Sequence, residues 1–89
     1  MAGEAQNKES MKEAIDTLNQ VATNNSTPKT IKKSITDLIA DLNSEEYSLS
    51  VRAANTISLL DDVTQDPNMP SYVRTQLWQA VSKLESIRE

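Results

Sequence analysis

The sequence has no cysteine, no histidine and no phenylalanine, and only one glycine among its 89 residues. Without cysteine it can form no disulfide and use no thiolate, and without histidine it lacks the most common general base and metal ligand. A β-rich fold of this length normally needs several glycines in its turns, whereas Gly3 is the only one here. The composition therefore indicates a helical protein that lacks many of the side chains most used in catalysis.

Basic residues are outnumbered, with 9 Lys and Arg against 13 Asp and Glu, so the net charge is -4. An acidic surface disfavours nucleic acid and anionic membranes as partners. No apolar run approaches the roughly 18 residues that a membrane-spanning helix needs. The N-terminal segment MAGEAQNKES also lacks the basic and apolar regions of a signal peptide. We therefore expect a cytoplasmic protein with no membrane partner.

Apolar residues recur at intervals of three and four, which is typical of amphipathic helices. The pattern predicts four helices, joined by short connections that make consecutive helices antiparallel neighbours. The predicted fold is therefore an all-α, single-domain antiparallel bundle of four short helices spanning residues 1–89. The helices are expected to run from Glu4–Asn7 to Ala22, from Thr27 or Pro28 to Leu42, from about Ser48 to Thr64, and from Asn68–Pro70 to about Arg88.

The starts of the helices have recognisable signals. Ser10 begins an S-x-x-E capping box, although a first helix that starts near Glu4 fits equally well. Thr27 is suited to cap the second helix with its side chain, because Pro28 then falls in the first turn, where a missing N–H costs nothing. Pro70 is expected to occupy the first turn of the fourth helix in the same way.

Aliphatic side chains must supply nearly all of the core, since the chain has one Trp, two Tyr and no Phe. The helical stripes predict which of them are buried. These are Ile15, Leu18, Ile31, Ile35, Leu38, Ile57, Leu60, Leu77, Val81 and Leu84.

The second and fourth predicted helices look alike when they are aligned with Pro28 on Pro70, an offset of 42 residues. Lys32 then aligns with Arg74. A repeat of two helices is one interpretation. The interpretation we favour is simpler, because any two amphipathic helices that begin at proline align this well.

Acidic residues are densest at Asp61, Asp62 and Asp66. Three carboxylates could hold Mg²⁺ or Ca²⁺, which prefer oxygen ligands, but the spacing and the missing glycine do not fit an EF-hand loop. We therefore expect solvated helix residues and a turn here. A small metal-dependent enzyme or divalent-cation binder is kept as the alternative function, with Glu45 and Glu46 as further carboxylates.

Lysines gather only at the start of the second predicted helix, at Lys29, Lys32 and Lys33. Such a cluster could contact phosphate, but no aromatic residue is interleaved with it. A solvated helix face is the expected role, because surface charge on helices is the usual case.

The candidate contact surface consists of Met69, Tyr72 and Trp78. Two prolines stiffen the connection that precedes Tyr72, and a stiff loop loses little entropy on binding. Trp and Tyr are also enriched at binding hot spots. The structural alternative is that Met69 packs under the helix start and Trp78 fills the edge of the bundle. The two interpretations differ in whether these side chains are exposed.

The segments LLDDVTQDPNMP and VRTQLWQAVSKLESI resemble the C-terminal part of a small archaeal group that is classed only as an uncharacterised protein family. Val51-Arg52-Ala53-Ala54 resembles the middle of the same group. The resemblance covers about Thr27 to Ile87, and it implies a compact helical bundle of unknown function with no catalytic residues to transfer. No motif points to a cofactor. We expect a non-enzymatic interaction or structural module that binds an unknown protein partner or a second copy of the chain.

Overall fold

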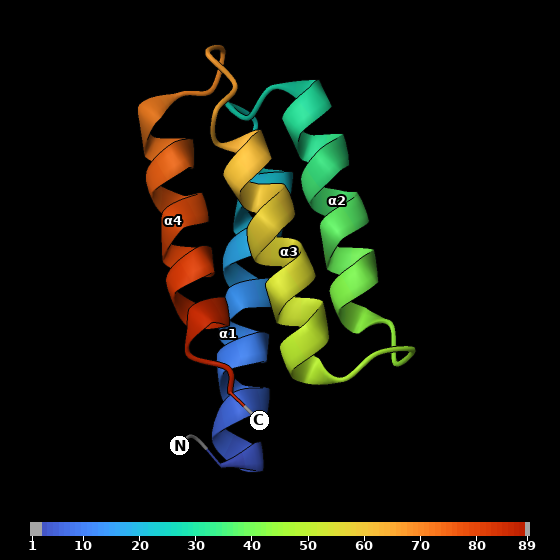
Figure 1. The fold of residues 1–89 in the computed structure, drawn as a ribbon. Helices are drawn as coiled ribbons and strands as arrows, with labels where there is room; N and C mark the ends of the chain where they lie inside the picture. The colour runs from blue at the N-terminus through green and yellow to red at the C-terminus, as the bar shows by residue number, and fades with distance from the viewer. Residues whose placement is uncertain (1–2, 89) are drawn as a thin grey trace.

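The computed structural model describes residues 3–88, and in that range it contains helices and no strand. Consecutive helices run in opposite directions along a molecule of 37 × 22 × 20 Å (Figure 1). The all-α antiparallel bundle predicted from the sequence is confirmed. The helices are α1 (Glu4–Thr23), α2 (Lys29–Asn43), α3 (Leu49–Val63) and α4 (Ser71–Glu85).

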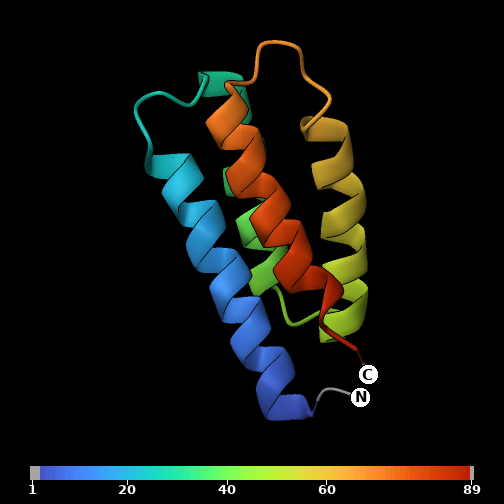
Figure 2. The ribbon, with the colours of Figure 1, turned by 90° about the vertical axis from the view of Figure 1, so that its left-hand side faces the viewer.

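The four helices form a closed ring in which the first helix packs against the last. The α1 helix packs most extensively against α4 and α2, and α3 closes the ring between α2 and α4. Figure 2 shows α1 and α4 side by side. The α1–α2 and α3–α4 connections lie at one end of the ring, and the α2–α3 connection lies at the other end with both ends of the described chain (Figure 1).

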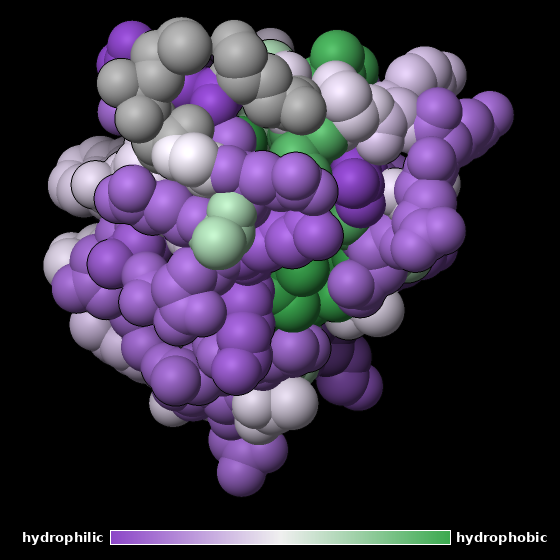
Figure 3. Space-filling view, turned by 90° about the horizontal axis from the view of Figure 1, so that it is seen from below, coloured by the Kyte–Doolittle hydropathy of each residue, from purple (hydrophilic) through white to green (hydrophobic). Residues whose placement is uncertain are grey.

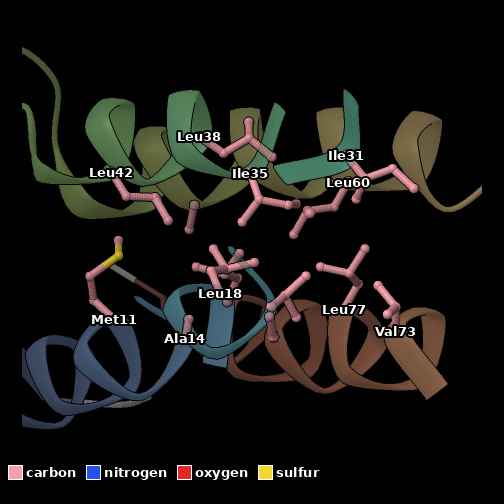
Figure 4. Packing of buried hydrophobic residues seen from close by; sticks show 14 of the residues in the cluster. Met11, Ala14, Leu18, Ile31, Ile35, Leu38, Leu42, Leu60, Val73 and Leu77 are labelled. Carbon is pink, nitrogen blue, oxygen red and sulfur yellow. The ribbon is translucent and has the colours of Figure 1, made fainter. Parts of the chain in front are cut away.

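The core is built from aliphatic side chains and methionine. Figure 4 shows Ile35 and Leu42 of α2 facing Leu18 and Met11 of α1. Each fully buried side chain of this kind contributes about 1.5–3 kcal/mol. Seven of the ten residues predicted for the core are buried, and three are partly buried at its margin. The buried seven are Leu18, Ile31, Ile35, Leu38, Leu60, Leu77 and Leu84, and the marginal three are Ile15, Ile57 and Val81.

A proline directly precedes both α2 and α4. Each proline was predicted in the first helical turn, but it occupies the N-cap position, one residue before that turn. Pro28 and Pro70 are the N-cap residues, with φ of -57° and -59°, and each carbonyl accepts the first helical hydrogen bond. The capping role predicted for Thr27 is therefore wrong. Its hydroxyl is buried and has no partner among the described residues. Proline fixes φ near the helical value, so it starts the helix without a side-chain cap.

The first helix starts at Glu4, which confirms the earlier of the two starts that the sequence allowed. Ser10 lies inside α1, so its capping-box spacing does not mark a helix start. Its hydroxyl instead accepts a hydrogen bond of 2.9 Å from the Ser86 hydroxyl. A buried hydroxyl needs a partner, and here the chain beyond α4 provides it.

The last helix ends at Glu85, earlier than predicted, but the chain after it stays attached to the bundle. Ile87 is buried, and the buried Asn7 side chain on α1 pairs with the backbone of Arg88. The Asn7 amide donates to the Arg88 carbonyl at 2.7 Å, and its oxygen accepts from the Arg88 N–H at 3.2 Å. This pair holds the described end of the chain beside the start of α1.

Candidate functional site

The α3–α4 connection is held by hydrogen bonds from its own backbone and from one arginine. The Arg74 guanidinium donates to the carbonyls of Thr64, at 3.0 Å, and Asp66, at 3.2 Å. The Asp66 carboxylate also accepts from the Asn68 N–H at 2.9 Å, which closes an Asx turn. The Met69 N–H in turn donates to the Asp66 carbonyl. This hydrogen-bond network adds to the restriction that the two prolines place on the backbone.

Met69 is not part of the accessible surface. Its side chain is only 5% exposed and belongs to the buried core. The structural alternative, in which this apolar residue packs beside the helix start, describes its position. Met69 must therefore be removed from the candidate contact surface.

Tyr72 and Trp78 are both exposed, at 44% and 56%, but they do not form one patch. They lie six residues apart on α4, and because a helix has 3.6 residues per turn their side chains point about 120° apart. The Tyr72 hydroxyl donates to the Asn24 side chain at 3.2 Å, so Tyr72 lies on the α1 side of α4. The candidate surface therefore divides into two separate contacts, with Trp78 on the other side of the helix.

Every aromatic side chain of the protein lies on its surface. Tyr47, in the α2–α3 connection, is 56% exposed, as is Trp78. Two aliphatic side chains of α3, Val51 and Leu59, are exposed as well, at 43% and 44%. Tyr72 and Trp78 were predicted from the sequence as contact residues, whereas the exposed apolar residues on α3 were not. The signal in the sequence is that this helix carries more apolar residues than the face that the core covers.

The acidic residues considered for metal binding do not form a metal site. Asp61 and Asp62 are exposed, and one oxygen of Asp66 is already used in the turn. In residues 3–88 there is no group of three or more Asp or Glu side chains positioned to hold an ion. The three carboxylates have the structural roles that the sequence favoured.

The three lysines at the start of α2 lie on its surface. Lys29 and Lys33 are exposed, and Lys32 is partly buried. Both ion pairs found among the described residues lie elsewhere, between Lys8 and Glu4 and between Lys83 and Glu13. The exposure fits the solvated helix face expected for this cluster.

A small pocket lies at the end of the bundle that carries the α2–α3 connection. Its volume is about 180 Å³, and its walls include Asp41, Glu46, Tyr47 and Arg52. Figure 3 views the molecule from this end, where hydrophilic atoms dominate and hydrophobic atoms show in a strip between them. Glu46 was predicted only as a further carboxylate. The pocket joins residues from two helices and a loop, so no single stretch of the sequence indicates it.

Two crystal structures share this four-helix fold, which defines the chain as a compact helical-bundle domain. One is a protein of unknown function, MMP1188, with a TM-score of 0.87, 35% identity, and coverage of 92% of this chain and 93% of that one. The other is a protein from the uncharacterised family UPF0147 of Thermoplasma acidophilum. It has a TM-score of 0.87, 32% identity, and coverage of 94% and 99%.

The chain belongs to the uncharacterised protein family UPF0147, whose sequence profile matches residues 1–87. A UPF0147 protein of Sulfurisphaera tokodaii is 38% identical over 89 residues and covers 100% of both chains. One of Metallosphaera sedula is 42% identical over 83 residues, or 93% of each chain. The resemblance to an uncharacterised archaeal family is confirmed, and it extends to the first helix, beyond the region recognised in the sequence.

The family has no established function, and no catalytic activity is assigned to it. Within residues 3–88, no helix combines the length and apolarity needed to cross a membrane.

Proposed function

We propose that this protein is a non-enzymatic interaction module, and that its surface aromatic side chains anchor a protein partner. One observation carries the proposal: the aromatic side chains, Tyr47, Tyr72 and Trp78, are all 44–56% exposed, while the core is packed without any of them. Aromatic residues offer the largest apolar area per side chain, so a marginal core of this size would gain from burying them. Their placement outside favours a role in contact rather than in folding.

Trp78 is the strongest anchor of the three. Trp and Tyr are enriched among the few interface residues that dominate binding energy, and each offers a large apolar surface with one polar tip. The Tyr72 hydroxyl already has an internal partner in Asn24, whereas none is found for the Trp78 indole N–H among the described residues. The indole is therefore available for both apolar contact and a hydrogen bond.

The test is affinity capture from cells that contain a family member, with wild type compared with single variants. Trp78→Ala is expected to reduce recovery of a specific partner by about tenfold or more, since hot-spot truncations cost 2 kcal/mol or more. Tyr72→Ala tests the second contact. Gln79→Ala, an exposed neighbour on α4, is the matched control.

Melting temperatures and sedimentation must accompany the capture experiment. Trp78→Ala should leave the melting temperature nearly unchanged, because an exposed side chain contributes little to the core. If sedimentation shows that wild type self-associates and Trp78→Ala does not, the partner is a second copy of the chain. Equal recovery and equal sedimentation for wild type, Trp78→Ala and Tyr72→Ala would refute the proposal.

A further inference from the structure

The pocket between the end of α2 and the start of α3 has the size of a site for one side chain. Its volume of about 180 Å³ is well below the roughly 300–1,000 Å³ of sites for drug-sized ligands. It lies where the last turn of α2, the α2–α3 connection and the first turns of α3 meet. A nucleotide or a large cofactor does not fit a pocket of this size, but the end of one long side chain does.

Charge in the pocket favours a cation. Arg52 is the only basic residue among the described residues that line it, and its guanidinium already donates to the carbonyls of Leu42, at 2.8 Å, and Ser48, at 3.5 Å. The carboxylates of Asp41 and Glu46 also line the pocket, and neither forms an ion pair within residues 3–88. Two unpaired carboxylates attract a positive group and repel an anion.

The Thr56 hydroxyl is a second polar feature of the pocket, because it makes no hydrogen bond within the described part of the bundle. Other threonines in these helices, such as Thr36 and Thr75, donate back to the carbonyl four residues earlier, at 2.8 and 3.1 Å. Thr56 is only 2% exposed and lines the pocket, yet no described residue hydrogen-bonds to its hydroxyl. The Thr56 oxygen is not among the buried side-chain atoms without a partner, so the hydroxyl is open to the pocket. There it is suited to accept a hydrogen bond from an incoming N–H.

The remaining walls suit a planar cation on an apolar stem. Tyr47 is 56% exposed and Leu59 is 44% exposed, and both line the pocket. An aromatic ring attracts a cation over its face, and a guanidinium also stacks on it. Leu59 offers apolar contact to the methylene stem that Arg and Lys carry beneath their charge.

We propose that this pocket binds one basic side chain, preferably arginine, from a partner polypeptide. The proposal rests on the function proposed above and adds the chemistry of the partner. The guanidinium lies against Tyr47, pairs with Asp41 and Glu46, and donates to the Thr56 hydroxyl. No covalent step is involved.

An NMR titration with a defined probe tests this binding directly. The probe is N-acetyl-arginine methylamide, and its control is the citrulline analogue, which has the same shape without the charge. We expect saturable shifts of the backbone amides in residues 41–59, with a dissociation constant on the order of 1 mM. The citrulline analogue should bind about tenfold more weakly, because charge-assisted hydrogen bonds are lost.

Variants separate binding from folding. Asp41→Asn and Glu46→Gln should each weaken binding by about fivefold, whereas Asp16→Asn, an exposed acid on α1, should not. Thr56→Val removes the hydroxyl and keeps the shape, so it should weaken binding without lowering the melting temperature. Thr56→Ser, which keeps the hydroxyl, should bind as wild type does.

Several results would overturn the proposal. Shifts that do not saturate, equal binding of arginine and citrulline probes, or wild-type affinity in Glu46→Gln and Thr56→Val would each show that the pocket does not select a cation through these groups. Tighter binding of spermidine than of the arginine probe, at the same amides, would assign the pocket to a free polyamine instead.

The titration needs no native partner, so it separates the two proposals. Trp78→Ala should bind the arginine probe as wild type does. If the titration fails while capture still depends on Trp78, the pocket assignment is wrong and the interaction module stands. If the titration succeeds and no capture depends on the aromatics, the function proposed above fails and the cation pocket remains.

Discussion

Arginine has the same structural role at two points of this chain. Arg52 and Arg74 are each the fourth residue of a helix, and each donates to a carbonyl ten residues earlier, at the end of the preceding helix. The last carbonyls of a helix lack partners within it, and the partial negative charge at that end favours a cation. Each arginine therefore joins two consecutive helices at their connection.

Replacing Arg74 should show the strength of this connection. Arg74→Met removes two charge-assisted hydrogen bonds and should lower the free energy of unfolding by about 1.5–3 kcal/mol. Urea denaturation followed by circular dichroism measures the change. Lys33→Met, at an exposed position of α2, should change stability by no more than about 0.5 kcal/mol. Equal effects of the two substitutions would contradict this role of Arg74.

The aliphatic core should be sensitive to single truncations. Leu77 is fully buried, so Leu77→Ala should cost about 2–5 kcal/mol through lost transfer energy and a new cavity. Leu38→Ala should cost a similar amount. Leu59→Ala is the control, because this leucine is 44% exposed. Thermal or urea unfolding compares the three, and an unchanged midpoint for Leu77→Ala would show that the assigned core is wrong.

Among the elements, α3 is the least firmly held. Only Ala53, Thr56 and Leu60 of its residues are buried, whereas α1 buries six of its own, and α3 touches α1 only slightly. We predict that backbone amides of α3 exchange with solvent faster than those of α1 and α4, because local opening exposes little apolar surface. Hydrogen exchange followed by NMR tests this order. Faster exchange in α1 than in α3 would contradict it.

The four helices could be predicted because their signals are local. Apolar spacing and the prolines place each helix to within a few residues, and Ser48 caps α3 as its position suggests, accepting from the Val51 N–H. The predicted core is correct at the centre of each stripe. Ile15 and Ile57 are only partly buried because a ring of four helices leaves the edges of each stripe near the surface.

The features that sequence analysis missed depend on contacts between distant residues. Asn7 looked like a polar residue near a chain end, yet it pairs with Arg88 across 81 positions. Met69 was weighed as a surface residue, and its burial depends on how α3 and α4 meet. The pocket beside Tyr47 likewise exists only once α2 and α3 are packed. None of these has a pattern of spacing that a single sequence shows.

The α2 and α4 helices resemble each other in their length and in how they begin. Both contain 15 residues and begin after a proline with closely similar dihedral angles. Arg74 donates from its side chain to the Thr64 carbonyl, however, whereas the aligned Lys32 side chain makes no such bond among the described residues. The similarity is explained by two proline-started amphipathic helices, and a true repeat stays a hypothesis.

At the scale of the whole molecule, the pair formed by Asn7 and Arg88 brings the two ends of the described chain together. A circular permutant that joins Arg88 to Gly3 through a short glycine-serine linker, with new ends between Asn25 and Ser26, should therefore fold. We expect the helical circular dichroism spectrum of the parent and a cooperative melt. Loss of helicity would show that the ends are not adjacent. The control is the parent chain cyclised through the same linker, without the new ends between Asn25 and Ser26.

The pairing of the first and last helices also has a consequence for synthesis. The surface that α1 buries most extensively is covered by α4, the last helix to leave the ribosome. Until α4 emerges, the face of α1 that α4 covers remains in contact with water. Contacts between residues so far apart in sequence also slow folding, since the loop between them must close first. The nascent chain therefore has no complete core until α4 has left the ribosome, and its folding is expected to wait for that helix.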